Sequence, residues 1–119
     1  MKYMIMMFGD GTSLMATRSE EWIGEMIGFM TRLDEELRDS GELVFQAGLA
    51  DGSAAKTFRA EGGTVTATDG PFAEAKESLI GYWIVDVADE ARVAAIASRI
   101  VEYAGVVEVR PVMDAPPEM

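Results

Sequence analysis

The chain has 119 residues, about half of them hydrophobic, and a formal net charge of −11. It has no histidine and no cysteine, so the commonest general base and metal ligands are missing, and we expect no metal site, no disulfide and no cofactor. The negative net charge disfavours nucleic-acid and anionic-membrane partners, because phosphates repel such a surface. A cytoplasmic protein is the default expectation.

The first half of the chain predicts a strand, a long helix and a second strand. The apolar run Tyr3–Phe8 is typical of a strand that is buried on both faces. Ser19 is expected to cap a helix that ends at Gly41, because apolar residues recur at helical spacing between them. Residues 43–50 form the second predicted strand.

The second half predicts a hairpin, a strand, a helix and a last strand. Two short strands flank Gly62-Gly63, a typical two-residue hairpin turn, and their alternation indicates one face exposed to water. Residues 79–87 form the longest strand, which is apolar on both faces. Asp89 is expected to cap the second helix, and residues 106–113 form the last strand.

Without the hairpin, the order is βαββαβ, which predicts an α+β, ferredoxin-like fold in one domain over residues 1–113, with a tail at 114–119. Both helices then cover one face of the sheet. The opposite face is too apolar to meet water, so a second copy is expected to stack on it sheet against sheet. The sequence therefore predicts a homodimer with an inserted hairpin in each subunit.

One segment has the composition of a functional site, namely Asp69–Glu77, which reads DGPFAEAKE. A turn explains its first four residues, with Asp69 accepting hydrogen bonds from the following amides and Phe72 folding back onto the core. The charges of Glu74, Lys76 and Glu77 are explained less well by a turn. They form either a solvated edge or the mouth of a pocket.

Other polar residues lie within predicted strands. Tyr82 is in the central strand, and Glu108 and Arg110 are two residues apart and therefore share one face of the last strand. Two interpretations of this pair have about equal weight. It is either a structural ion pair or a clamp in which Arg110 grips a ligand carboxylate.

The segment DGPFAEAKE closely resembles the signature of the DGPF proteins, within the YCII-related family. The resemblance covers essentially the whole chain and includes Met1-Lys2-Tyr3, Gly81-Tyr82 and the closing segment 108–112. Ala75 departs from the pattern, where Thr or Ser is more usual. The resemblance implies a ferredoxin-like subunit and a dimeric α+β barrel. It implies no settled activity, because the branch with proposed catalysis uses a His-Asp pair, and this chain has no histidine.

Two functions of different class follow. DGPF proteins are often linked to alternative sigma factors, so the resemblance implies a small-molecule-binding or regulatory module by association. The alternative is a cofactor-free isomerase or lyase acting in the barrel. In that enzyme, Asp69 or Glu77 is the base, Lys76 or Arg110 the electrostatic clamp, and Tyr82 the proton donor. The sequence leaves the two close to even.

Overall fold

The computed structural model describes residues 1–9, 17–72 and 78–114. Its elements are β1 (Lys2–Gly9), α2 (Glu20–Asp39), β2 (Leu43–Gly48), the 3₁₀ turn η1 (Gly52–Ala54), β3 (Lys56–Glu61), β4 (Thr64–Asp69), β5 (Ser78–Asp86), α3 (Glu90–Ala104) and β6 (Val106–Pro111). The predicted order of strands and helices is confirmed. The last strand is two residues shorter than predicted.

Both helices begin and end at the expected residues. The Ser19 Oγ accepts a hydrogen bond from the Trp22 N–H at 3.1 Å, and the Asp89 carboxylate accepts one from the Arg92 N–H at 2.9 Å. Gly41 follows α2 and Gly105 follows α3, with φ of +79° and +81° respectively. Only glycine takes this left-handed conformation readily, so the two positions stop the helices.

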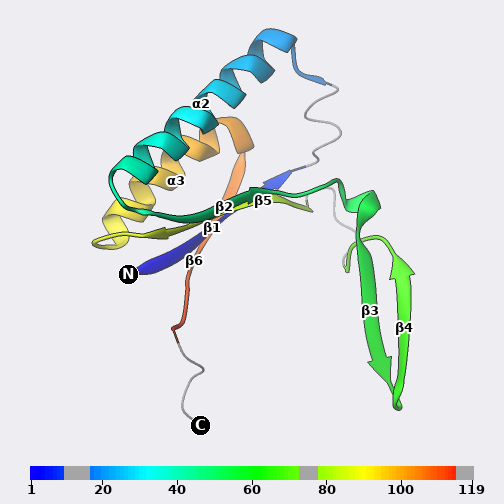
Figure 1. Ribbon diagram of the computed structural model, residues 1–119. Coiled ribbons are helices and arrows are strands. Elements are labelled where there is room, and N and C mark those ends of the chain that lie inside the picture. Colours follow the sequence, from blue (N-terminus) through cyan, green and yellow to red (C-terminus); the bar gives the residue numbers. More distant parts are fainter. Residues whose placement is uncertain (10–16, 73–77, 115–119) are drawn as a thin grey trace.

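Four antiparallel strands form the main sheet in the order β2-β5-β1-β6. This is the ferredoxin-like arrangement, in which the two outer strands are the second and last of the βαββαβ series. Helices α2 and α3 lie side by side over one face (Figure 1). The core lies between the helices and this face, and its fully buried residues include Ile5, Val85, Leu33, Leu37, Val93, Ile96 and Ile100.

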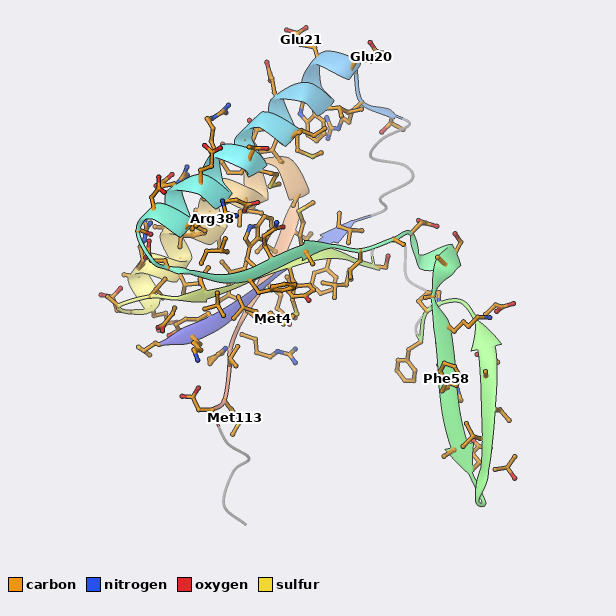
Figure 2. The ribbon with its side chains drawn as sticks, viewed as in Figure 1. Met4, Glu20, Glu21, Arg38, Phe58 and Met113 are labelled. Atoms are coloured by element: carbon orange, nitrogen blue, oxygen red, sulfur yellow. The ribbon has the colours of Figure 1, made fainter. Side chains whose placement is uncertain are left out.

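The opposite face of the sheet, called the open face below, carries no helix from the part of the chain that the structure describes. Strand register places Met4, Ile84 and Phe45 in one row and Met6, Tyr82 and Ala47 in the next. Met4 points away from the helices (Figure 2). Phe45 is 54% exposed, and Met4, Tyr82 and Ile84 are partly exposed. In a single chain, β1 and β5 are therefore buried on one face only, whereas their composition predicts burial on both.

Strands β3 and β4 form a separate hairpin that projects from the body of the subunit (Figure 1). Gly62 and Gly63 have φ of +55° and +82°, as a two-residue turn with both central residues at positive φ requires. Register places Phe58, Ala60, Val65 and Ala67 on one face, and threonines, Arg59 and Glu61 on the other. The alternation is confirmed, but the apolar face is also uncovered, with Phe58 67% exposed (Figure 2).

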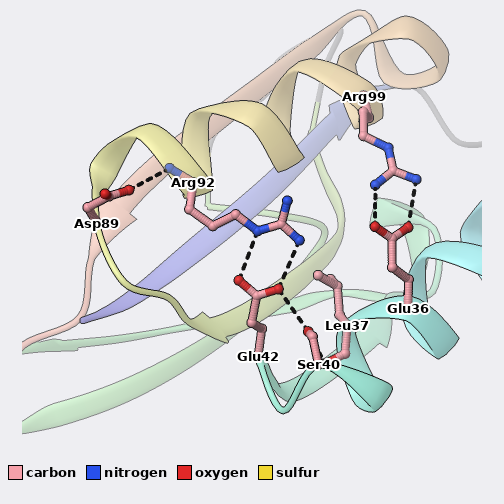
Figure 3. Close-up of polar contacts among 7 residues, drawn as sticks. All are labelled: Glu36, Leu37, Ser40, Glu42, Asp89, Arg92 and Arg99. Atoms are coloured by element: carbon pink, nitrogen blue, oxygen red, sulfur yellow. Dashed lines mark hydrogen bonds and ion pairs between the residues drawn. The ribbon is translucent and has the colours of Figure 1, made fainter.

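Ion pairs join α3 to α2 and the start of β2 (Figure 3). The Arg92 guanidinium donates to both carboxylate oxygens of Glu42, at 2.9 and 2.8 Å, and the Ser40 hydroxyl donates to the same carboxylate at 2.8 Å. The hydrogen bond from Arg92 lowers the pKa of Glu42 and outweighs the opposing effect of burial. A second pair, Arg99 with Glu36 at 3.0 Å, lowers the pKa of Glu36 in the same way.

We expect the Arg92→Gln variant to be less stable by about 1 kcal/mol at pH 7, the value of a well-oriented but partly solvated ion pair. Because the folded pKa of Glu42 lies below its unfolded value, its contribution is present above pH ~4.5 and is lost as the pH falls through the folded pKa. The difference between wild type and variant should therefore shrink between about pH 5 and pH 3.

Urea unfolding at pH 7, 5, 4 and 3 measures this difference. Arg32→Gln is the matched control, because Arg32 is on the exposed side of α2, and it should change the stability little at any of these pH values. If the stability difference between wild type and Arg92→Gln stays constant down to pH 3, the pH dependence assigned to the Arg92–Glu42 ion pair is contradicted.

Candidate functional site

Asp69 is the last residue of β4 and lies on the projecting hairpin. Its carboxylate pairs with the Lys56 ammonium at 2.9 Å and is 88% exposed. Phe72 is 76% exposed, and the Arg59 guanidinium lies 5.0 Å from its ring centroid. The expectation that Phe72 folds back onto the core is therefore wrong. Glu74, Lys76 and Glu77 lie outside the described residues.

A pocket of about 330 Å³ lies at the base of the hairpin. Pro71 and Ser78, which flank residues 73–77, both line it, together with Leu49 and the η1 turn. One polar group in this wall, the Asp51 carboxylate, already accepts a hydrogen bond from the Ser53 N–H at 3.0 Å. Among the described residues of the wall, Asp51 is the one ionisable side chain, so the wall offers no second acid or base for a proton transfer.

Tyr82 and Arg110, two of the predicted site residues, lie on the open face in neighbouring rows. The Tyr82 ring packs near the Phe45 ring, with centroids 6.2 Å apart. Arg110 forms an ion pair with Glu108 at 2.8 Å, and its side chain is 71% exposed. The spacing of residues 108 and 110 left an ion pair and a ligand clamp open, and in the single chain the two side chains form the ion pair.

A second pocket, called the α2 pocket below, opens between α2 and the helix-covered side of the sheet. Its volume is about 160 Å³. It combines thioether and other apolar groups with one carboxylate and one amide. The lining residues are Met7, Met26, Met30, Asp34, Gln46, Ala47, Gly48, Ile80, Gly81 and Trp83.

Asp34 is the polar anchor of the α2 pocket. The buried Trp83 donates its indole Nε1–H to the Asp34 Oδ1 at 2.9 Å. This bond fixes the carboxylate on the inner side of the helix, and Gln46 lies opposite Trp83 in the strand register. A half-buried carboxylate beside an amide and an apolar wall is the composition of a small-molecule site, in which a few polar groups orient an otherwise apolar ligand.

Asp34 is not among the site residues predicted from the sequence, although its spacing along α2 carries a signal. Met26, Met30 and Asp34 are spaced four residues apart, so they lie along one stripe of the helix that also faces the sheet. An acidic residue in an apolar stripe indicates a specific partner, because an unpaired buried charge is costly. The partner, Trp83, is 49 residues away in the sequence and could not be identified by local spacing.

Within residues 1–9, 17–72 and 78–114, no group of three or more acidic residues is arranged to hold a metal ion. No helix in the same ranges is both long and apolar enough to cross a membrane.

Comparison with known proteins gives two findings. The family model described as the YCII-related domain matches residues 1–116. An uncharacterised protein of Rhizobium meliloti (strain 1021) is 32% identical over 93 residues, which cover 76% of this chain and 74% of the relative.

Proposed function

The chain belongs to the YCII-related family, and we propose that it works as a homodimeric module that binds a small molecule in the α2 pocket. The observation that carries the proposal is the Asp34 carboxylate, held by the Trp83 indole at 2.9 Å inside a mostly apolar pocket. The size of the pocket, about 160 Å³, is close to that of an engineered cavity of about 150 Å³ in another protein that binds benzene.

The geometry supports binding ahead of the cofactor-free isomerase or lyase. Proton transfer needs an acid and a base within hydrogen-bond reach of the same substrate atoms. Among the described residues predicted for that role, Asp69 is ion-paired on the hairpin, whereas Tyr82 and Arg110 are on the main sheet. The enzyme thus depends on Lys76 and Glu77, which the described ranges do not include.

A second copy is the proposed cover of the open face. Register places two basic and two acidic residues on this face, Lys2, Arg110, Asp86 and Glu108, so the face is neutral in a chain of net charge −11. Stacking two such neutral faces therefore avoids the repulsion that two acidic surfaces would meet.

The hairpin is expected to take part in the interface of the proposed dimer, because the sheet alone is small for an interface. Four strands spaced about 4.8 Å apart and about six residues long cover a flat area of about 400 Å². A stable interface buries about 800 Å² of accessible surface per partner, so contacts beyond the sheet would bring the dimer nearer to that size. An isolated two-stranded hairpin is marginally stable in water. Packing the exposed Phe58 and Val65 against the second copy would supply area and stabilise the hairpin.

Filling the α2 pocket tests the binding function. Gly48 lines the pocket, its φ is not positive, and a Cβ added there meets no atom within 4 Å. The Gly48→Leu variant should therefore fold but lose the stabilisation by benzene-sized compounds. For wild type, a compound at about 100 times its dissociation constant should add about 2.7 kcal/mol in a thermal-shift screen.

Gly24→Leu is the matched control, because a Cβ at Gly24 also meets nothing within 4 Å and Gly24 is not part of the pocket. It should respond to the same compounds as the wild type does. The proposal fails if no benzene-sized compound stabilises the wild type, or if Gly48→Leu responds to them equally.

A further inference from the structure

We infer that the α2 pocket selects small organic cations, namely protonated primary amines carried on an apolar group about the size of benzene. The inference rests on the proposed binding function and names the ligand class. Three observations support it: the hydrogen bonding of the Asp34 carboxylate, the chemistry of the pocket wall and the net charge of the whole chain.

The Asp34 carboxylate has one oxygen engaged and one available. Oδ1 accepts the Trp83 indole hydrogen bond at 2.9 Å. In the part of the chain that the structure describes, no hydrogen bond or ion pair reaches Oδ2. None of the described residues that line the pocket is basic. Among residues 1–9, 17–72 and 78–114, the available oxygen therefore has no cationic partner, and an ammonium group is a donor that it binds strongly.

The wall of the pocket suits a cation that carries an apolar body. The thioethers of Met7, Met26 and Met30 line it, and these soft, unbranched side chains adapt to the shape of a ring. The Trp83 indole is also in the lining, and an ammonium over the face of an indole ring, within about 6 Å of its centroid, is attracted by the ring quadrupole. The volume of about 160 Å³ admits one six-membered ring and its amine.

The net charge of the chain favours a positively charged ligand. A net charge of −11 raises the local concentration of cations and lowers that of anions. A carboxylate ligand would also have to lie beside the Asp34 carboxylate, and like charges in a half-buried site repel strongly. Protonated amines are therefore favoured both while the ligand approaches the protein and when it lies beside Asp34.

Three probes of nearly equal shape separate charge from size: benzylamine, benzyl alcohol and benzoate. Binding is followed at pH 7 by NMR of ¹³C-methyl methionine, with Met7, Met26 and Met30 reporting on the α2 pocket and Met4 and Met6 on the open face. We expect benzylamine to bind at least about tenfold more tightly than benzyl alcohol, as a hydrogen bond to a charged group implies. Benzoate should cause no shift.

The Asp34→Asn variant removes the charge but keeps a side-chain oxygen that can accept the Trp83 hydrogen bond. It should bind benzylamine and benzyl alcohol with about equal affinity. Asp39→Asn is the matched control, because Asp39 is an exposed residue of the same helix outside the pocket. It removes an identical charge and should keep the preference for benzylamine.

The outcomes distinguish this inference from the function on which it rests. Equal affinity of the wild type for benzylamine and benzyl alcohol would overturn the amine preference while the binding function stands. A preference that Asp34→Asn retains would also overturn it. Absence of shifts with all three probes would overturn both proposals, as would shifts confined to Met4 and Met6.

Discussion

Replacing Ile84 with Asp is expected to convert the proposed dimer into monomers, with a dissociation constant at least about a hundredfold higher. Ile84 lies in the middle of the open face, between Phe45 and Met4 in the strand register. In the stacked dimer, an Asp here would be a buried carboxylate without a partner, which costs several kcal/mol. In a single chain, position 84 keeps some contact with water, so folding should be affected far less than assembly.

Sedimentation velocity from about 1 to 50 µM follows this change, and circular dichroism confirms that the variant is folded. Ile27→Asp is the matched control, because Ile27 is 53% exposed on α2 and is remote from the open face; it should remain dimeric. A wild-type protein that sediments as a monomer, or a dimeric Ile84→Asp variant, would contradict the proposed assembly.

Replacing Trp83 with Phe is expected to lower the free energy of unfolding by about 2 kcal/mol. Trp83 is 5% exposed and makes the hydrogen bond to Asp34. Losing that bond costs about 1 kcal/mol, and the void left by the smaller ring adds about as much. For a domain of this size, the melting temperature should fall by about 8 °C.

Two variants separate the contributions to this loss, measured by urea unfolding and calorimetry. Trp22→Phe is the control, because Trp22 packs near Tyr103 and Arg18 at a half-buried position and should cost less than about 1 kcal/mol. Asp34→Asn keeps an acceptor for the indole and should retain most of the stability. A Trp83→Phe protein as stable as the wild type would show that the contact does not hold the pocket together.

Most of the fold could be predicted because its signals are local. Ser19 and Asp89 cap helices, Gly41 and Gly105 end them, and Gly62-Gly63 turns the hairpin, each through the conformation of a few neighbouring residues. Strand order follows from the connections between these elements. The YCII-related membership, inferred from DGPFAEAKE and the rest of the chain, is also confirmed.

The candidate site could be predicted only in part, because it depends on contacts between distant residues. Glu108 and Arg110 were linked correctly since alternation along one strand places them together. The Asp34–Trp83 contact joins a helix to a strand and requires the packed structure. The position of the Phe72 side chain was predicted wrongly. A turn sequence determines the local bend of the backbone, but it does not determine which surface the next side chain contacts.

The position of the hairpin has a consequence for how this protein can diverge. β2 and β5 pair directly, with Gly48 opposite Gly81, so the four-stranded sheet is continuous without any contribution from β3 or β4. Lengthening a connection costs little, about 0.6 kcal/mol per doubling of its length. Mutation can therefore change the length of the hairpin or its apolar face while the four-stranded sheet and the α2 pocket stay intact.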